Sequence, residues 1–269
     1  MQQSKSFEDV EVLKGAQRSA EVLAHDSRLN SPIHLTQILP NNPVFSMTKN
    51  FWKSLHVDEK CLKNHIRLMA GYQQLPVTLL LNPCRFHSGE FHDMFGKMSA
   101  LGWLKQVFDS IGLDIEHEVP IWDILPMMCD EWFEKMARSG RKEEVEKMVF
   151  QGYELIEQYL ERFKPPAIVV LQCTTHACRE TKYSFLQTVH HPLAKALCSS
   201  LDRALEGKCE TIRYRNHDVC VVPGFHPSAF NYEQDVLERD VLAKALKRTL
   251  ISVYKPYAEA CFEKTMNTT

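Results

Sequence analysis

The chain has 269 residues, of which 44% are hydrophobic and 25% charged, so it is long enough to bury a sizeable core. Its formal net charge of -2 excludes a protein held to nucleic acid by bulk positive charge, although it leaves a local basic patch open. No run of 18 apolar residues occurs, so we expect no membrane-spanning segment.

The nine cysteines are odd in number and irregularly spaced, which argues against a disulfide framework. Cys173 and Cys178 flank His176, a pattern open to metal binding, but no second ligand pair stands at a zinc spacing. The first ten residues, MQQSKSFEDV, lack the basic-then-apolar pattern of a signal peptide. We therefore expect a soluble intracellular protein with reduced thiols and no metal.

The first third of the chain is polar before its first buried strand. Helical periodicity predicts a helix over 10–23, and the Pro- and Asn-rich segment 31–48 predicts an extended arm. A second helix is expected over 58–71. The continuous apolar run 76–83 is typical of a strand buried on both faces.

The middle of the chain alternates between the same two patterns. It predicts a helix over 95–111, a short strand over 119–126 and a long amphipathic helix over 130–163, broken near Ser139-Gly140. The apolar run 165–173 then predicts a third buried strand.

The last third predicts a helix over 182–206, one or two strands over 210–222, and a terminal helix pair over 235–266, split near Pro256. We assign residues 1–40 to an N-terminal arm and 41–269 to one α/β domain. Alternating strands and helices imply a parallel sheet with helices on both faces.

Polar residues stand at four of the predicted strand ends: Asn82, Asp123, Gln172 and His226. In open parallel sheets, ligands bind beyond the carboxyl ends of the strands. We therefore expect these four side chains to converge on one cleft, the alternative being that each only caps a strand or turn.

Two loops far apart in the sequence carry the most specific pattern. The first strand ends in Asn82-Pro83, followed by Phe86 and, thirteen residues after Asn82, by Phe95-Gly96. The late run Val219–Val222 leads into His226-Pro227-Ser228, whereas His191-Pro192 is a second, isolated His-Pro pair.

This pairing resembles the uracil-DNA glycosylase superfamily, and within it the single-strand-selective monofunctional branch. The segment from Asp123 to Met128 and the arm Asn42-Pro43-Val44 stand in matching places, and the similarity runs from about residue 40 to 250. The resemblance implies a three-layer αβα fold around a mostly parallel four-stranded sheet. It also implies a nuclear, monomeric enzyme of base excision repair that acts on DNA.

The resemblance also implies roles for individual residues. Asn82 would orient the attacking water, His226 would donate a hydrogen bond to the leaving base, and Phe95 would stack on the extruded base. Phe230 would enter the gap left in the DNA, and Ser228 would bind a phosphate. No lysine stands beside either motif to form a Schiff base, which favours a monofunctional enzyme without cofactor.

The predicted site contains more residues than these. The base-binding set is Leu81, Cys84, Phe86, Phe95 and Asp123. The DNA-binding set is Arg85, Ser228, Phe230 and Asn231.

The chain departs from the family pattern at Leu80, Cys84, Asp123 and Phe230. Asp123 replaces an Asn that would accept from uracil N3–H and donate to O4, whereas an ionised Asp only accepts. We therefore expect an altered base preference, unless a dry pocket protonates Asp123 or the side chain faces away and caps a neighbouring helix. We expect the side chain of Cys84 to exclude, in part, small substituents on carbon 5 of a pyrimidine.

Two other functions stay open from the sequence. One is a binding module that keeps the fold and the pocket but has lost turnover. The other is an enzyme that acts on nucleosides or nucleotides, for which a near-neutral charge would suffice.

Overall fold

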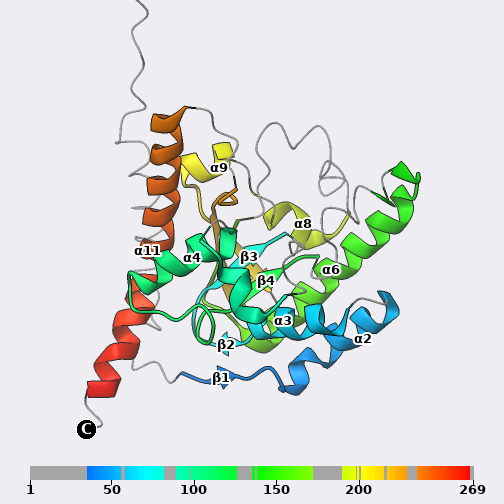
Figure 1. Cartoon of the computed structure of the whole chain (residues 1–269), viewed down its shortest axis with the longest axis horizontal. Helices are drawn as coiled ribbons and strands as arrows, with labels where there is room; N and C mark the ends of the chain where they lie inside the picture. The colour runs from blue at the N-terminus through cyan, green and yellow to red at the C-terminus, as the bar shows by residue number, and fades with distance from the viewer. Residues whose placement is uncertain are drawn as a thin grey trace, which may run out of the picture.

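The computed structural model shows a central sheet with helices packed around it (Figure 1). The residues that it describes are 35–55, 58–81, 89–97, 99–125, 135–136, 138–171, 190–197, 199, 201–214, 217–228 and 235–266.

The central sheet has five strands in the spatial order β4-β3-β5-β7-β6. They are β3 (Val77–Leu80), β4 (Ile121–Asp123), β5 (Ala167–Val170), β6 (Glu210–Tyr214) and β7 (His217–Pro223). All pairings are parallel except that of β6 with β7. The prediction of an α/β fold with a mostly parallel sheet is confirmed.

The four-stranded sheet implied by the resemblance is wrong. The segment 210–222, expected to hold one or two strands, forms a β-hairpin, which brings the number of strands to five. Tyr214 pairs with His217 across the turn, which adds β6 as an antiparallel edge strand. The residues of β6 are mostly exposed, whereas every residue of β3 and β5 is buried. A solvated edge strand lacks the continuous apolar run that marks the central strands.

The remaining elements are a small second sheet and the helices. A two-stranded antiparallel sheet joins β1 (Gln37–Ile38) to β2 (Gly71–Tyr72). The helices are η2 (Pro43–Phe45), α2 (Ser46–Leu55), α3 (Glu59–Met69), η4 (Phe91–Phe95), α4 (Ala100–Asp109), α6 (Lys142–Phe163), α8 (Pro192–Ala196), α9 (Leu201–Glu206) and α11 (Val236–Met266).

Two apolar cores cover the two faces of the sheet. Trp122 and Val221 point into the first core, which joins the sheet to α2, α6 and α8. Their strand neighbours Ile121 and Val222 point into the second core, with η4, α4 and α11, as the two-residue period of a strand requires. Figure 1 shows α4 and α11 on one side of the strands and α6 on the other, consistent with a three-layer αβα arrangement.

Most predicted helices are found where the sequence placed them, with three differences. The helix over 10–23 lies outside the described residues. The prediction that 31–48 is extended is wrong at its end, which contains η2 and the first residues of α2, and the sequence predicts no element for the rest of α2. The described part of 182–206 holds two short helices, the first of which begins at Pro192. The division of the chain at residue 40 stays a prediction.

The prediction of a terminal helix pair is wrong, because α11 continues through Pro256 as one helix. Proline removes one backbone donor and crowds the preceding turn. Here Tyr254 and Tyr257, on either side of it, are both buried against the sheet. Tertiary packing of this kind outweighs local propensity. None of the described helices is long and apolar enough to cross a membrane.

Gly152 allows α6 to approach the end of β4 closely. A Cβ atom at this position would lie 2.2 Å from the carbonyl oxygen of Ile124, the residue after Asp123. Because that neighbour is backbone, it cannot rotate away as a side chain would. The packing of α6 against this end of the sheet therefore depends on glycine.

We predict that Gly152→Ala lowers the free energy of unfolding by about 1–3 kcal/mol, the usual cost of overpacking. Alanine favours a helix over glycine by up to about 1 kcal/mol, so the sign of the result distinguishes crowding from propensity. Urea denaturation gives the value. The matched control is Gly96→Ala, whose Cβ would meet only an ordinary 3.5 Å contact. Equal or higher stability of Gly152→Ala would contradict the close approach.

Candidate functional site at the carboxyl edge of the sheet

Backbone hydrogen bonds beyond the strands bring four chain segments together at one edge. The N–H of Ile124 donates to Leu80 O over 3.1 Å, and that of Leu171 donates to Leu79 O over 2.8 Å. The N–H of Gly224 donates to Val170 O over 2.9 Å. The carboxyl ends of β3, β4, β5 and β7 are thus adjacent, which we call the carboxyl edge.

At this edge lies the point where the order in which strands are added to the sheet changes from one side of β3 to the other. β3 pairs with β4 on one side and with β5 on the other, so the connection from β4 crosses β3 to reach β5. Crevices at such reversal points are where open α/β sheets bind ligands.

The structure describes part of the predicted site. Leu81, Phe95, Asp123, His226 and Ser228 are described, and all except Phe95 lie on or next to strand ends. The predicted residues outside the described part of the chain are Asn82, Cys84, Arg85, Phe86, Gln172, Phe230 and Asn231.

His226 is held by its own loop in a defined chemical form. Its Nδ1 atom accepts the backbone N–H of Ser228 over 3.1 Å, and the Ser228 hydroxyl lies 2.6 Å from the same nitrogen. A nitrogen that accepts a hydrogen bond carries no proton, so the neutral ring bears its hydrogen on Nε2. Phe225, 2% exposed, anchors the loop in the second core, while His226 is half-buried. The ring is thereby oriented as a donor.

The second His-Pro pair forms the same turn but is buried. His191 Nδ1 accepts the backbone N–H of Leu193 over 3.1 Å and caps α8. Its ring stacks on Tyr153 at a centroid distance of 5.3 Å and meets the edge of Phe150. The dipeptide therefore fixes the local turn, and the surroundings of each pair set how deeply its histidine is buried.

Asp123, the last residue of β4, makes a buried contact that the sequence did not predict. It is 3% exposed, and its Oδ2 lies 3.4 Å from Nδ1 of His65, which is 0% exposed. His65 lies in the middle of α3, so the alternative that Asp123 caps a helix is not what the structure shows. Trp52 of α2 stacks on the imidazole with centroids 5.8 Å apart.

This pair contains buried polar atoms without hydrogen-bond partners. Within the described chain, Asp123 Oδ1 and both ring nitrogens of His65 make no hydrogen bond. Buried polar groups in proteins are nearly always satisfied, so each unsatisfied one calls for a functional or structural explanation.

Three side chains of α3 contact residues 89–91. Asn64 Nδ2 donates to the carbonyl of Gly89 over 2.9 Å, and Lys60 Nζ lies 2.5 Å from Glu90 Oε1. The guanidinium of Arg67 lies 3.6 Å from the ring centroid of Phe91. Helix α3 therefore connects residues 89–91 to the end of β4.

Phe95 and Asp123 belong to the same face of the sheet. Leu80 is the register partner of Asp123, and it points into the second core, against which Phe95 also packs. The Phe95 ring is half-buried and meets Phe91 edge-on at 5.4 Å. The edge-on contact with Phe91 helps to fix the orientation of the Phe95 ring.

Leu81 faces the opposite way. Its side chain is 7% exposed within the first core, and its carbonyl oxygen accepts the N–H of Leu125 over 2.8 Å. The predicted base contact at Leu81 is therefore restricted to the main chain.

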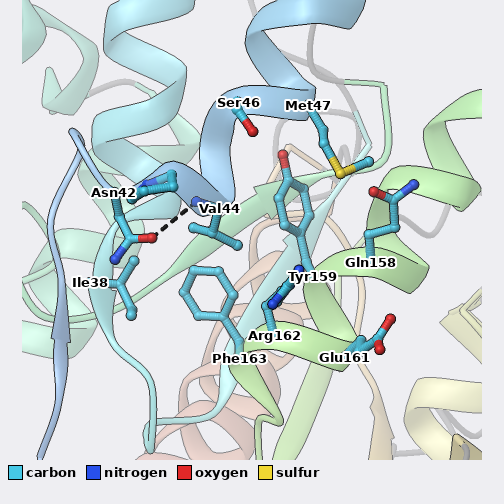
Figure 2. Close-up of a pocket in the computed structure, with 11 residues that line it drawn as sticks. Ile38, Asn42, Val44, Ser46, Met47, Gln158, Tyr159, Glu161, Arg162 and Phe163 are labelled. Atoms are coloured by element: carbon cyan, nitrogen blue, oxygen red, sulfur yellow. Dashed lines mark hydrogen bonds between the residues drawn. The ribbon is translucent and has the colours of Figure 1, made fainter.

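The described structure also contains a pocket of about 620 Å³ away from the carboxyl edge. It lies between η2, the start of α2 and the last turns of α6, and Tyr159 and Phe163 form its wall (Figure 2). Asn42 accepts the N–H of Val44 over 3.0 Å and so caps η2. The Asn-Pro-Val arm thus borders this pocket and not the residues at the strand ends.

No group of three or more His, Cys, Asp or Glu side chains suited to a metal occurs among the described residues. Cys173, His176 and Cys178 lie outside them.

Sequence reasoning missed His65. A signal was present, because Asn64 and His65 are polar residues that stand next to the apolar positions of the helical segment 58–71. Polar residues at such positions are expected to be paired.

Comparison with known proteins adds no assignment: no protein-family model matches the chain, and no curated protein matches it.

Burial of His191 provides a test of the distinction between the two histidines. Desolvation lowers the pKa of its imidazole, against the opposing effect of the Glu157 and Glu154 carboxylates. The unfolded chain therefore binds a proton at His191 at a higher pH than the folded protein does. The contribution of His191 to the free energy of unfolding must therefore fall as the pH drops below about 6.5, the ordinary pKa of histidine.

We predict that His191→Phe, which keeps the aromatic stack, makes the free energy of unfolding fall less steeply between about pH 7 and about pH 5. Loss of the α8 cap shifts stability equally at every pH, so the slope is the informative quantity. Denaturant titrations across this range measure it, and parallel profiles for the two proteins would contradict the assignment.

Proposed function

We propose that the protein is a monofunctional DNA glycosylase that extrudes and hydrolytically excises uracil or a related deaminated or oxidised base. The observation that carries the proposal is His226, held at the carboxyl edge with its hydrogen on Nε2. An imidazole that carries its hydrogen on Nε2 can donate a hydrogen bond from that atom to a leaving base.

The chemistry of base excision explains why this form of histidine matters. Cleavage of the glycosidic bond leaves positive character on the sugar and negative charge on the departing base. A donor fixed before the reaction stabilises that charge without reorganisation. The Ser228 hydroxyl, close to Nδ1, holds the ring in place. Ser228 thus has a role beside the phosphate contact predicted from the sequence.

The neighbouring groups suit the other requirements of the reaction. β3 leads directly into Asn82, for which we propose the water-orienting role. Phe95, half-buried and fixed by Phe91, is suited to stack on an extruded base. Asp123 supplies a polar atom at the next strand end. DNA repair, and with it a nuclear location, follows from the same proposal.

We predict that His226→Leu lowers the rate of base release by about 10²–10³-fold, the usual loss for one donor to a developing anion. Asn82→Ala should also abolish most of the release. His191→Gln is the matched control, because it alters the other His-Pro pair, and it should keep nearly full activity. Single- and double-stranded oligonucleotides containing uracil or oxidised pyrimidines serve as substrates.

Three results are distinguishable in this assay. Release lost in both variants and kept in the control supports the proposal. Oligonucleotide binding without release would identify a binding module, and release from free nucleosides alone would identify a nucleoside hydrolase. Either outcome would overturn the proposal.

A further inference from the structure

We propose that the outer face of α11 binds the sugar-phosphate backbone of the nucleic acid strand whose base reaches the carboxyl edge. This inference rests on the proposed function and adds a phosphate-binding surface to it. It begins from four exposed basic residues of α11, Lys244, Lys247, Arg248 and Lys255, which we call the basic stripe.

The basic stripe lies in a segment that carries no negative charge. Residues 241–258 contain these four basic residues and no Asp or Glu, although the whole chain has a formal net charge of -2. Exposed helix faces usually mix the two signs. Like charges four residues apart, such as Lys244 and Arg248, destabilise a helix slightly. The stripe therefore holds a repulsion that a bound polyanion would relieve.

Helical spacing places the four side chains on one face of α11. The other three follow Lys244 by three, four and eleven residues, so their directions fall within roughly 100° around the helix axis. Leu246 and Val253 point the opposite way, into the second core. From Lys244 to Lys255 the helix rises about 16 Å, a length that corresponds to about five phosphates of one strand in a duplex.

The inner face of α11 connects the stripe to the carboxyl edge. Leu246 Cδ1 lies 3.5 Å from the position that a Cβ atom would take on Gly224, two residues before His226. Further along the helix, the Tyr254 hydroxyl lies 2.7 Å from Thr78 Oγ1, near the start of β3. Helix α11 thus runs from the carboxyl edge toward the opposite edge of the sheet, and Figure 1 shows it along one outer side of the molecule.

Three charges of the stripe are close to the His226 loop for this reason. Lys244, Lys247 and Arg248 are within two residues of Leu246 and lie on the outer side of the helix at the same height. A helix with its side chains is about 10–12 Å across. Three phosphates beside an extruded nucleotide span about 10 Å, so the backbone that continues from the site reaches these cations.

The charges of the stripe are largely uncompensated. Among the described residues, Lys244, Lys247 and Arg248 form no ion pair. Lys255 forms one exposed pair with Glu259 over 3.5 Å, which contributes little in water. The cations are therefore available to phosphates.

The surroundings of the stripe favour nucleic acid over a membrane or a protein partner. Within 241–258, a range that is described throughout, no large hydrophobic side chain is exposed. A helix that binds a membrane inserts an apolar face, and α11 buries its own in the second core. Protein interfaces depend on a few large buried anchors, whereas phosphates require only exposed cations.

The salt dependence of binding tests the inference. The probe is a fluorescently labelled, undamaged single-stranded oligonucleotide, and anisotropy gives its Kd over a range of NaCl concentrations. We expect the double variant Lys247→Gln/Arg248→Gln to reduce the slope of log Kd against log[NaCl] by about 1.4, because each lost phosphate contact removes about 0.7. At about 50 mM NaCl its Kd should rise about tenfold or more.

A matched control separates the stripe from bulk charge. Arg141→Gln/Lys147→Gln removes one arginine and one lysine from exposed positions at the start of α6, where Arg141 pairs with Glu144. This control should keep the wild-type slope. An equal loss in both double variants, an unchanged slope in the stripe variant, or no binding by the wild type would overturn the inference.

Two further measurements complete the test. Vesicles of phosphatidylserine and phosphatidylcholine in equal amounts replace the oligonucleotide, and binding to them that depends on the stripe while the oligonucleotide slope does not would identify a membrane surface and overturn the inference. Circular dichroism confirms that each variant is folded.

Failure of the proposed function gives a separate result, because the undamaged probe requires no base release. Binding through the stripe without release of any base overturns the glycosylase and leaves the nucleic acid surface in place. If base release occurs, the stripe variant should raise KM about as much as Kd and keep the wild-type kcat. Release with an unchanged KM would overturn the stripe and leave the glycosylase.

Discussion

The parallel pairing of β3, β4, β5 and β7 is the constraint on which the rest of the structure depends. It fixes the register of strands separated by long stretches of sequence, with Leu80 opposite Asp123 and Val170 opposite Pro223. Adjacent strands lie about 4.8 Å apart, so the ends of β4 and β7 are separated by roughly 14 Å across three spacings. That span can hold one pyrimidine base between the side chain of Asp123 and that of His226. The helices on both faces bury the sheet, and its carboxyl edge is where we propose that the reaction takes place.

The sequence was sufficient for the central part of the fold because buried parallel strands are continuous apolar runs. Val77–Leu80 and Ala167–Val170 are recognisable in this way. For 210–222 the sequence left one or two strands open, because an edge strand with exposed residues such as β6 has no such run. The continuity of α11 was not predictable either. Pro256 gives a local signal to stop, whereas the burial of Tyr254 and Tyr257 is a property of the assembled protein.

The candidate site shows the same division. His226 was identified from its place after an apolar run, and the structure adds the form of its ring through the Ser228 N–H. His191 forms the same turn, so the dipeptide alone does not distinguish a cap from a site. The partner of Asp123 was beyond the sequence, because His65 is 58 residues away and no spacing rule connects a mid-helix residue to a strand end. Asn82 and Phe230 stay predictions of the sequence.

The central claim is that the carboxyl edge receives an extruded base, and histidine side-chain NMR tests it most directly. The probe is a single-stranded oligonucleotide whose target sugar carries a 2′-fluoro group, since fluorine disfavours the positive sugar and keeps the base attached. The account predicts that saturating probe moves the Nε2–H signal of His226, assigned with His226→Leu, and leaves that of His191 in place. Saturable binding of the probe without any change at His226 would contradict it.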